Sequence, residues 1–122
     1  MSVAERIAAD STLTRVQIET LELQKRVLAG EIKPGQAAAH RTGKISRGQL
    51  TAGSYHRVLD QARHNIRASI LTVLAAMQLG YVKYEDLARL LELVGTRTAE
   101  LQGEEADRLL GVLNALLDRL VM

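Results

Sequence analysis

Apolar residues recur along most of this chain at spacings of three and four, which is the period of an amphipathic helix. No run of four or more residues alternates apolar and polar between turn residues, as a half-buried strand would. The clearest helical stretch extends from Tyr55 to Leu79 and ends before Gly80. At 100° per residue, one face of this stretch holds Tyr55, Leu59, Ala62, Ile66, Ile70, Val73 and Met77. The pattern predicts an all-α fold with a long central helix.

Residues that cap and stop helices divide the first third of the chain. Ser2 stands three residues before Glu5, the spacing of a capping box, and Gly30 is a helix stop. Asp10–Thr12 favour caps over helix interiors, so we expect an interruption there. Pro34 fits the first turn of a short helix that ends at Gly43.

Later boundaries follow from the same kinds of residue. Residues 44–53 lack clear periodicity and predict a loop or a helical turn, with Ser54 as the N-cap of the central helix. Two C-terminal helices are predicted, one over about 83–94 and one over about 104–122.

The central helix changes character along its length. His56, Arg57, Asp60, Arg63, His64 and Arg67 share an arc about 120° wide beside the apolar face. Ile70–Leu79 is apolar almost all round, which predicts burial on every side. The leucine stripe of the last helix is wider than one neighbour needs, which favours a homodimer, with an ordinary monomer core as the alternative.

A length of 122 residues indicates a single domain over 1–122, in which 25–79 holds the basic helices and 80–122 the packing and dimerisation region. The chain contains no cysteine, which excludes disulfides, a thiol nucleophile and a cysteine zinc site. Its start has no signal-peptide pattern, and its longest apolar stretch is too short for a bilayer. We therefore expect a cytoplasmic protein without a membrane partner.

Charge is segregated along the chain. Residues 25–67 hold nine Lys or Arg against Glu31 and Asp60, a balance of +7, whereas residues 1–24 carry −2 and residues 68–122 carry −3. A basic segment between acidic flanks attracts polyanions while the whole molecule stays soluble. The alternative is that these basic side chains form an ordinary solvent-exposed surface that binds no partner.

The basic segment also resembles a known motif. Val27–Glu31, Pro34–Arg41 and Leu50–Leu59 together resemble the helix-turn-helix core of winged-helix regulators of the PadR and MarR type, over 33 of the 122 residues. The resemblance implies a recognition helix that begins near Ser54 and lies in the DNA major groove, with Thr51, Ser54, His56 and Arg57 facing the DNA. No wing follows in this sequence, and residues 44–50 lengthen the turn.

Physical chemistry leads to the same partner without the resemblance. Lys and Arg side chains on a rigid helix neutralise phosphates, and Arg57 can contact guanine through two hydrogen bonds. The three tyrosines, without Phe or Trp, supply little base stacking, which favours duplex DNA over single strands or RNA. The expected DNA-binding residues are Arg41, Lys44, Arg47, Thr51, Ser54, His56, Arg57, Arg63, His64 and Arg67. If two copies bind one duplex, their recognition helices should lie about 34 Å apart.

Two other functions remain open. Arg57 and His64 have the spacing of the Arg-x4–6-His motif of HEPN ribonucleases, which this helix resembles in that one respect. Alternatively, the protein is a helical adaptor whose leucine-rich C-terminal helix binds another protein. The sequence shows no catalytic triad, phosphate loop or metal-ligand cluster, so we expect a protein that is not an enzyme and uses no cofactor or metal.

Overall fold

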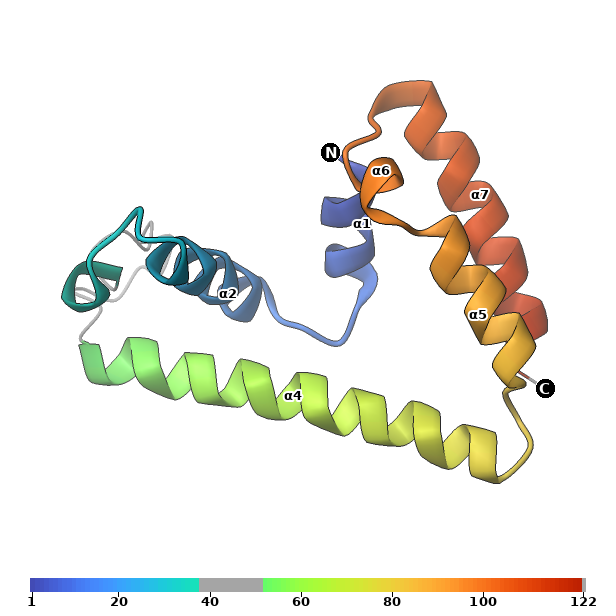
Figure 1. Cartoon of the computed structure of the whole chain (residues 1–122), viewed down its shortest axis with the longest axis horizontal. Helices are drawn as coiled ribbons and strands as arrows, with labels where there is room; N and C mark the ends of the chain where they lie inside the picture. The colour runs from blue at the N-terminus through green and yellow to red at the C-terminus, as the bar shows by residue number, and fades with distance from the viewer. Residues whose placement is uncertain (38–51, 122) are drawn as a thin grey trace. The chain divides into compact units, whose positions relative to one another are not determined.

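The computed structural model describes residues 1–37 and 52–121. All regular secondary structure in this part is α-helix or 3-10 helix, which confirms the all-α prediction (Figure 1). In chain order the elements are α1 (Val3–Asp10), α2 (Arg15–Leu28), the 3-10 helix η1 (Pro34–Gln36), α4 (Ala52–Gln78), α5 (Tyr84–Leu93), α6 (Thr96–Ala99) and α7 (Gly103–Leu120). The predicted helices at 83–94 and 104–122 correspond to α5 and α7 to within two residues at each end. The four-residue helix α6 was not expected.

The predicted capping box is present at the start of α1. The Ser2 backbone N–H donates to Glu5 Oε1 at 3.1 Å, and the Glu5 N–H donates to Ser2 Oγ at 3.2 Å. Two hydrogen bonds from Ser2 lower the pKa of Glu5. The larger effect comes from the Ser2 backbone N–H and the smaller from the Ser2 hydroxyl. The expected interruption is confirmed as well, because α1 ends at Asp10 and Thr14 caps α2.

Two of the predicted glycine stops, Gly30 and Gly80, are confirmed and share one geometry, whereas the predicted stop at Gly43 lies outside the described residues. Gly30 and Gly80 have φ of +79° and +82°, the left-handed conformation that ends helices most readily at glycine. After α2, Glu31 N–H donates to Arg26 O; after α4, Tyr81 N–H donates to Ala76 O, both at 2.9 Å. Each of these hydrogen bonds reaches back five residues along the chain. Each glycine N–H also donates to the carbonyl three residues before it, and the two bonds together form the Schellman motif.

The described chain gathers into two compact units, each with its own apolar cluster. The first unit comprises Met1–Ser11 and Ala68–Met122, and the second comprises Thr12–Arg67, so α4 contributes to both. The prediction of a single domain stays a prediction.

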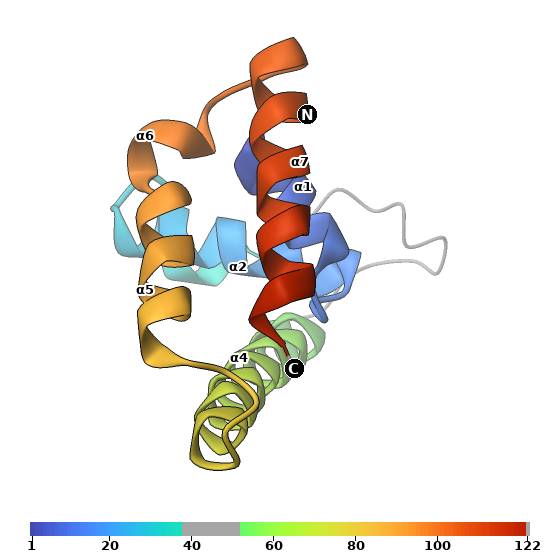
Figure 2. The same cartoon turned by 90° about the vertical axis from the view of Figure 1, so that its right-hand side faces the viewer.

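In the first unit, α5 and α7 lie side by side, and α1 packs against α6 and α7 (Figures 1 and 2). Its cluster consists of Val3, Ala106, Leu110 and Leu113, with half-buried neighbours from α1, α5 and α7. Most of the leucine stripe of α7 is therefore used inside the chain, while Val112, Leu117 and Val121 remain exposed. This reduces the need for a second subunit on α7.

In the second unit, α2 packs antiparallel against the first half of α4. The Tyr55 hydroxyl near the start of α4 donates to Gln24 Oε1 at 3.2 Å, late in α2. Ten residues further along α4, Asn65 Nδ2 donates to Gln17 Oε1 at 3.1 Å, in the first turn of α2. The cluster between the helices consists of Leu23, Ile32, Ala37, Tyr55 and Leu59.

The prediction that Ile70–Leu79 is buried is wrong for the single chain. Ile70, Leu74 and Leu79 are 56%, 51% and 73% exposed, and neither apolar cluster includes a residue of this stretch. The physical reason is that apolar periodicity shows which residues require cover but does not show whether the same chain supplies it.

Candidate nucleic-acid interface

Helix α4 carries the predicted basic face on an uninterrupted rod. The helix runs without a break over Ala52–Gln78, as Figure 1 shows, so side chains on one arc keep their relative positions. The predicted start was three residues late, because Ser54 lies inside the helix as its third residue and is half-buried rather than capping it. Cap preferences do not fix a helix start more closely than this.

All six side chains of the predicted arc are exposed. These are His56, Arg57, Asp60, Arg63, His64 and Arg67, which we call the basic face. The apolar face beside it is buried along the same turns, with Tyr55, Leu59 and Ala62 no more than 3% exposed. Packing of that side in the second unit therefore turns the basic face towards solvent. From His56 to Arg67 it extends about 16 Å along the helix axis.

The guanidinium groups of the basic face are largely available to a polyanion. Within the described residues, neither Arg57 nor Arg67 has an acidic side chain at ion-pair distance. Arg63 Nη1 lies 4.0 Å from Asp60 Oδ1, with both side chains more than half exposed. A surface pair at that distance contributes little and competes weakly with a phosphate. With neutral histidines, three arginines against Asp60 leave +2.

Polar contacts hold the far end of the basic face in place. Asn65, next to His64, donates through Nδ2 to Thr12 O at 2.9 Å and accepts from Thr12 Oγ1 through Oδ1 at 2.8 Å. Together with the Tyr55 hydroxyl, this fixes the rotation of α4 about its axis relative to α2. Asn65 was not predicted as a functional residue, although its sequence position places a polar side chain at the edge of the apolar face of α4.

The remaining predicted contact residues lie outside the described part of the chain. These are Arg41, Lys44, Arg47 and Thr51, and the turn of the helix-turn-helix resemblance lies there with them. The structure thus brings together five of the predicted contact residues on α4, namely His56, Arg57, Arg63, His64 and Arg67.

The spacing of Arg57 and His64 is relevant to the ribonuclease alternative. Both side chains are exposed on the basic face. Seven residues of helix separate them by about 10 Å along the axis, almost two turns. Within one chain, that separation is long for two groups acting on a single phosphate.

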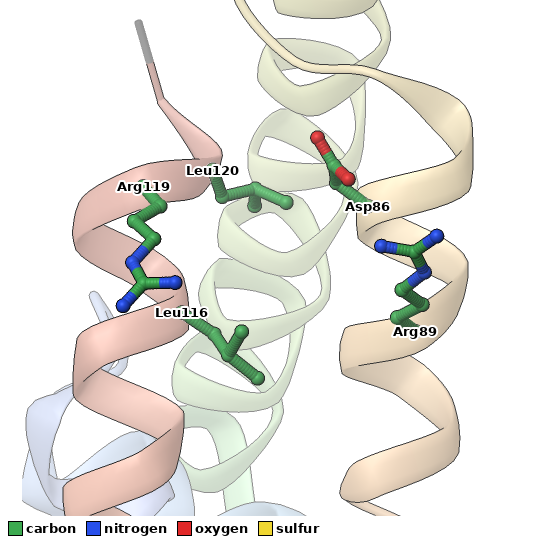
Figure 3. Close-up of a pocket in the computed structure, with 5 residues that line it drawn as sticks. All are labelled: Asp86, Arg89, Leu116, Arg119 and Leu120. Atoms are coloured by element: carbon green, nitrogen blue, oxygen red, sulfur yellow. The ribbon is translucent and has the colours of Figure 1, made fainter.

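A small cavity of about 270 Å³ opens in the first unit, between α5 and α7. The cavity is lined by Asp86 and Arg89 of α5 and by Leu116, Arg119 and Leu120 of α7, and Figure 3 shows the two leucine side chains directed towards α5. Its volume lies just below the usual range of ligand pockets, and its single acid is outnumbered by two arginines. The cavity therefore favours a small anion, but it lacks the convergent polar groups that define a specific site.

Among residues 1–37 and 52–121, no group of three His, Asp or Glu side chains is placed to hold a metal ion. None of the described helices has the length and apolarity needed to cross a bilayer.

Comparison with protein-family models, curated proteins and solved structures found no match for this chain. The helix-turn-helix resemblance therefore rests on Val27–Glu31, Pro34–Arg41 and Leu50–Leu59 alone.

Proposed function

We propose that this protein binds duplex DNA through the basic face of α4 and acts as a homodimeric transcriptional regulator or chromatin-type protein in the cytoplasm, on nucleoid DNA. The observation that carries the proposal is the exposure of Arg57, Arg63 and Arg67 on one arc of an unbroken helix whose adjacent apolar face is packed. A rigid row of guanidinium groups neutralises phosphates without the ordering cost of a flexible basic tail.

Duplex DNA fits this face better than RNA does. A helix about 10–12 Å across, side chains included, enters the major groove of B-form DNA, which is about 12 Å wide, whereas the major groove of A-form RNA is too narrow. Each arginine on the arc then reaches a phosphate or a base edge. The two exposed histidines add hydrogen-bond donors on the same side.

The test is a titration of a fluorescent duplex at several salt concentrations. Arg57→Ala and Arg63→Ala should each weaken binding, and each should reduce the slope of log affinity against log salt by about 1. Asp60→Asn should strengthen binding, because it removes the one negative charge on the basic face and releases Arg63. Single-stranded DNA and RNA of the same length should bind more weakly than the duplex.

Arg108→Ala is the matched control. Arg108 is exposed on α7 and pairs only loosely with Glu104, at 3.8 Å, so its removal changes the net charge equally without touching α4. If Arg108→Ala weakens binding as much as Arg57→Ala does, the basic face is not the interface. Salt-independent binding would exclude the proposal. Cleavage of RNA that is lost in His64→Ala would support the ribonuclease alternative instead.

A further inference from the structure

The apolar face of α4 continues beyond the part that the second unit covers. Tyr55, Leu59 and Ala62 are buried, but the next residues on the same face are not. We call these next four residues, Ile66, Ile70, Val73 and Met77, the α4 seam. Ile66, Ile70 and Val73 are 38%, 56% and 38% exposed, and Met77 is half-buried. Among the described residues, neither apolar cluster includes any of the four.

The seam has the spacing of a helix-pairing surface. Its residues follow one another at intervals of four, three and four, the a and d positions of a heptad. Residues 68–82 contain no charged side chain at all. A surface of this kind packs favourably against another uncharged, apolar helix. Packing a polar or charged helix against it would bury polar groups without hydrogen-bond partners.

We propose that the α4 seam is the homodimer interface, in which α4 packs antiparallel against α4 of a second copy of this chain. The spacing of the seam residues, four, three and four, is the same from either end. In an antiparallel pair Ile66 therefore faces Met77 of the other copy, and Ile70 faces its Val73. This self-matching is the requirement of a two-fold symmetric contact. Apolar residues then meet apolar residues along the whole length of the pair.

The charges beside the seam select the antiparallel orientation. On its N-terminal side α4 carries Arg57, Arg63 and Arg67, and on its C-terminal side the first turn of α5 carries Glu85 and Asp86. Within the described residues, these two acids have no ion pair. A parallel pair would place identical arginines beside each other, whereas an antiparallel pair places the basic end of one copy beside the acidic turn of the other.

The antiparallel pair also places two basic faces for one ligand; this step depends on the proposed function. In such a pair the two-fold axis is perpendicular to both helices, so both basic faces point to the same side. The centre of the basic face lies ten residues from the centre of the seam, so the two basic faces are about 30 Å apart along the helix direction. Successive major grooves on one side of a duplex are about 34 Å apart.

The first test measures mass in solution without DNA, by sedimentation over a dilution series. The chain should reach twice its 13.4 kDa at high concentration, and Ile70→Glu and Val73→Glu should each remain monomeric. Leu28→Glu is the matched control, because Leu28 is 76% exposed on α2, away from the seam, and this variant should still dimerise. Circular dichroism of each variant checks that the helices are retained.

The second test determines the orientation of the pair. Because the natural chain contains no cysteine, any disulfide must form between the introduced residues. A mixture of Ile66→Cys and Met77→Cys chains should form a mixed disulfide on oxidation, because these positions face each other. Ile66→Cys alone should not form a homodisulfide, because its two copies lie about 16 Å apart along the axis.

Three results would overturn the dimer proposal: a monomer at every concentration, a dimer that persists in both Glu variants, or efficient self-linking of Ile66→Cys. None of them depends on DNA, so failure of the dimer is distinguishable from failure of the proposed function. If the dimer forms but Arg57→Ala binds duplex DNA as well as the natural chain does, the seam stands and the proposed function falls.

Discussion

Thr20 is a residue whose chemistry does not match its surroundings. It lies in α2 with no exposed surface, and its hydroxyl finds no hydrogen-bond partner in the described part of the structure. The backbone carbonyl of the same residue accepts from the Tyr55 hydroxyl at 3.4 Å, and this contact does not require the threonine side chain. The desolvated hydroxyl is therefore a cost at the contact between α2 and α4.

Replacing Thr20 by Val should stabilise the protein. Val keeps the branched shape and removes the unpaired hydroxyl, so the free energy of unfolding should rise by about 1 kcal/mol in urea denaturation. Thr20→Ser is the control, because it keeps the hydroxyl and loses a methyl group, and it should destabilise. A less stable Thr20→Val variant would mean that the hydroxyl has a partner in solution.

Among the elements, the turns after α2 and α4 are built in the same way. Each helix ends in a left-handed glycine, followed after one residue by a buried β-branched side chain, Ile32 or Val82, and then by an extended lysine. The glycine ends the helix and the buried side chain anchors the next segment. The repeat is visible in the sequence as Gly-Glu-Ile-Lys and Gly-Tyr-Val-Lys, of which only the glycines were predicted as helix stops.

The conformation of Gly80 can be tested directly. A Cβ at Gly80 would meet nothing within 4 Å, so Gly80→Ala isolates the cost of the positive φ. We expect a loss of about 1–2 kcal/mol in the free energy of unfolding. Gly35→Ala is the matched control: it also meets nothing within 4 Å, but its φ is not positive, so it should be neutral or slightly stabilising. Equal effects of the two substitutions would show that the turn relaxes without the left-handed conformation.

Local chemistry explains which elements the sequence could predict. The capping box at Ser2, the glycine stops and the unbroken course of α4 depend on residues close together in the chain, and all three are confirmed. The exposure of the basic face followed from the buried apolar face beside it. The exposure of Ile70 and its neighbours could not be predicted in this way, because burial depends on distant segments or on another molecule.

At the scale of the whole molecule, residues 1–37 and 52–121 form two apolar clusters, one in each compact unit. Leu23 belongs to one and Leu110 to the other, and each is 5–6% exposed. Chain length alone indicated one folding unit, because length bounds the size of a core but not its continuity. Continuity depends on which helix faces meet, and sequence periodicity does not specify that pairing.

Hydrogen exchange should show whether the two clusters unfold independently. Leu110→Ala leaves a cavity among α1, α5 and α7, and such substitutions cost about 2–5 kcal/mol. Because Leu23 belongs to the cluster of the second unit and Leu110 to that of the first, amides of α2 should keep their protection while those of α7 lose it. The reciprocal variant Leu23→Ala should affect α2 and spare α7. Equal loss of protection in both helices would show that the chain unfolds as one cooperative domain, as its length alone indicates.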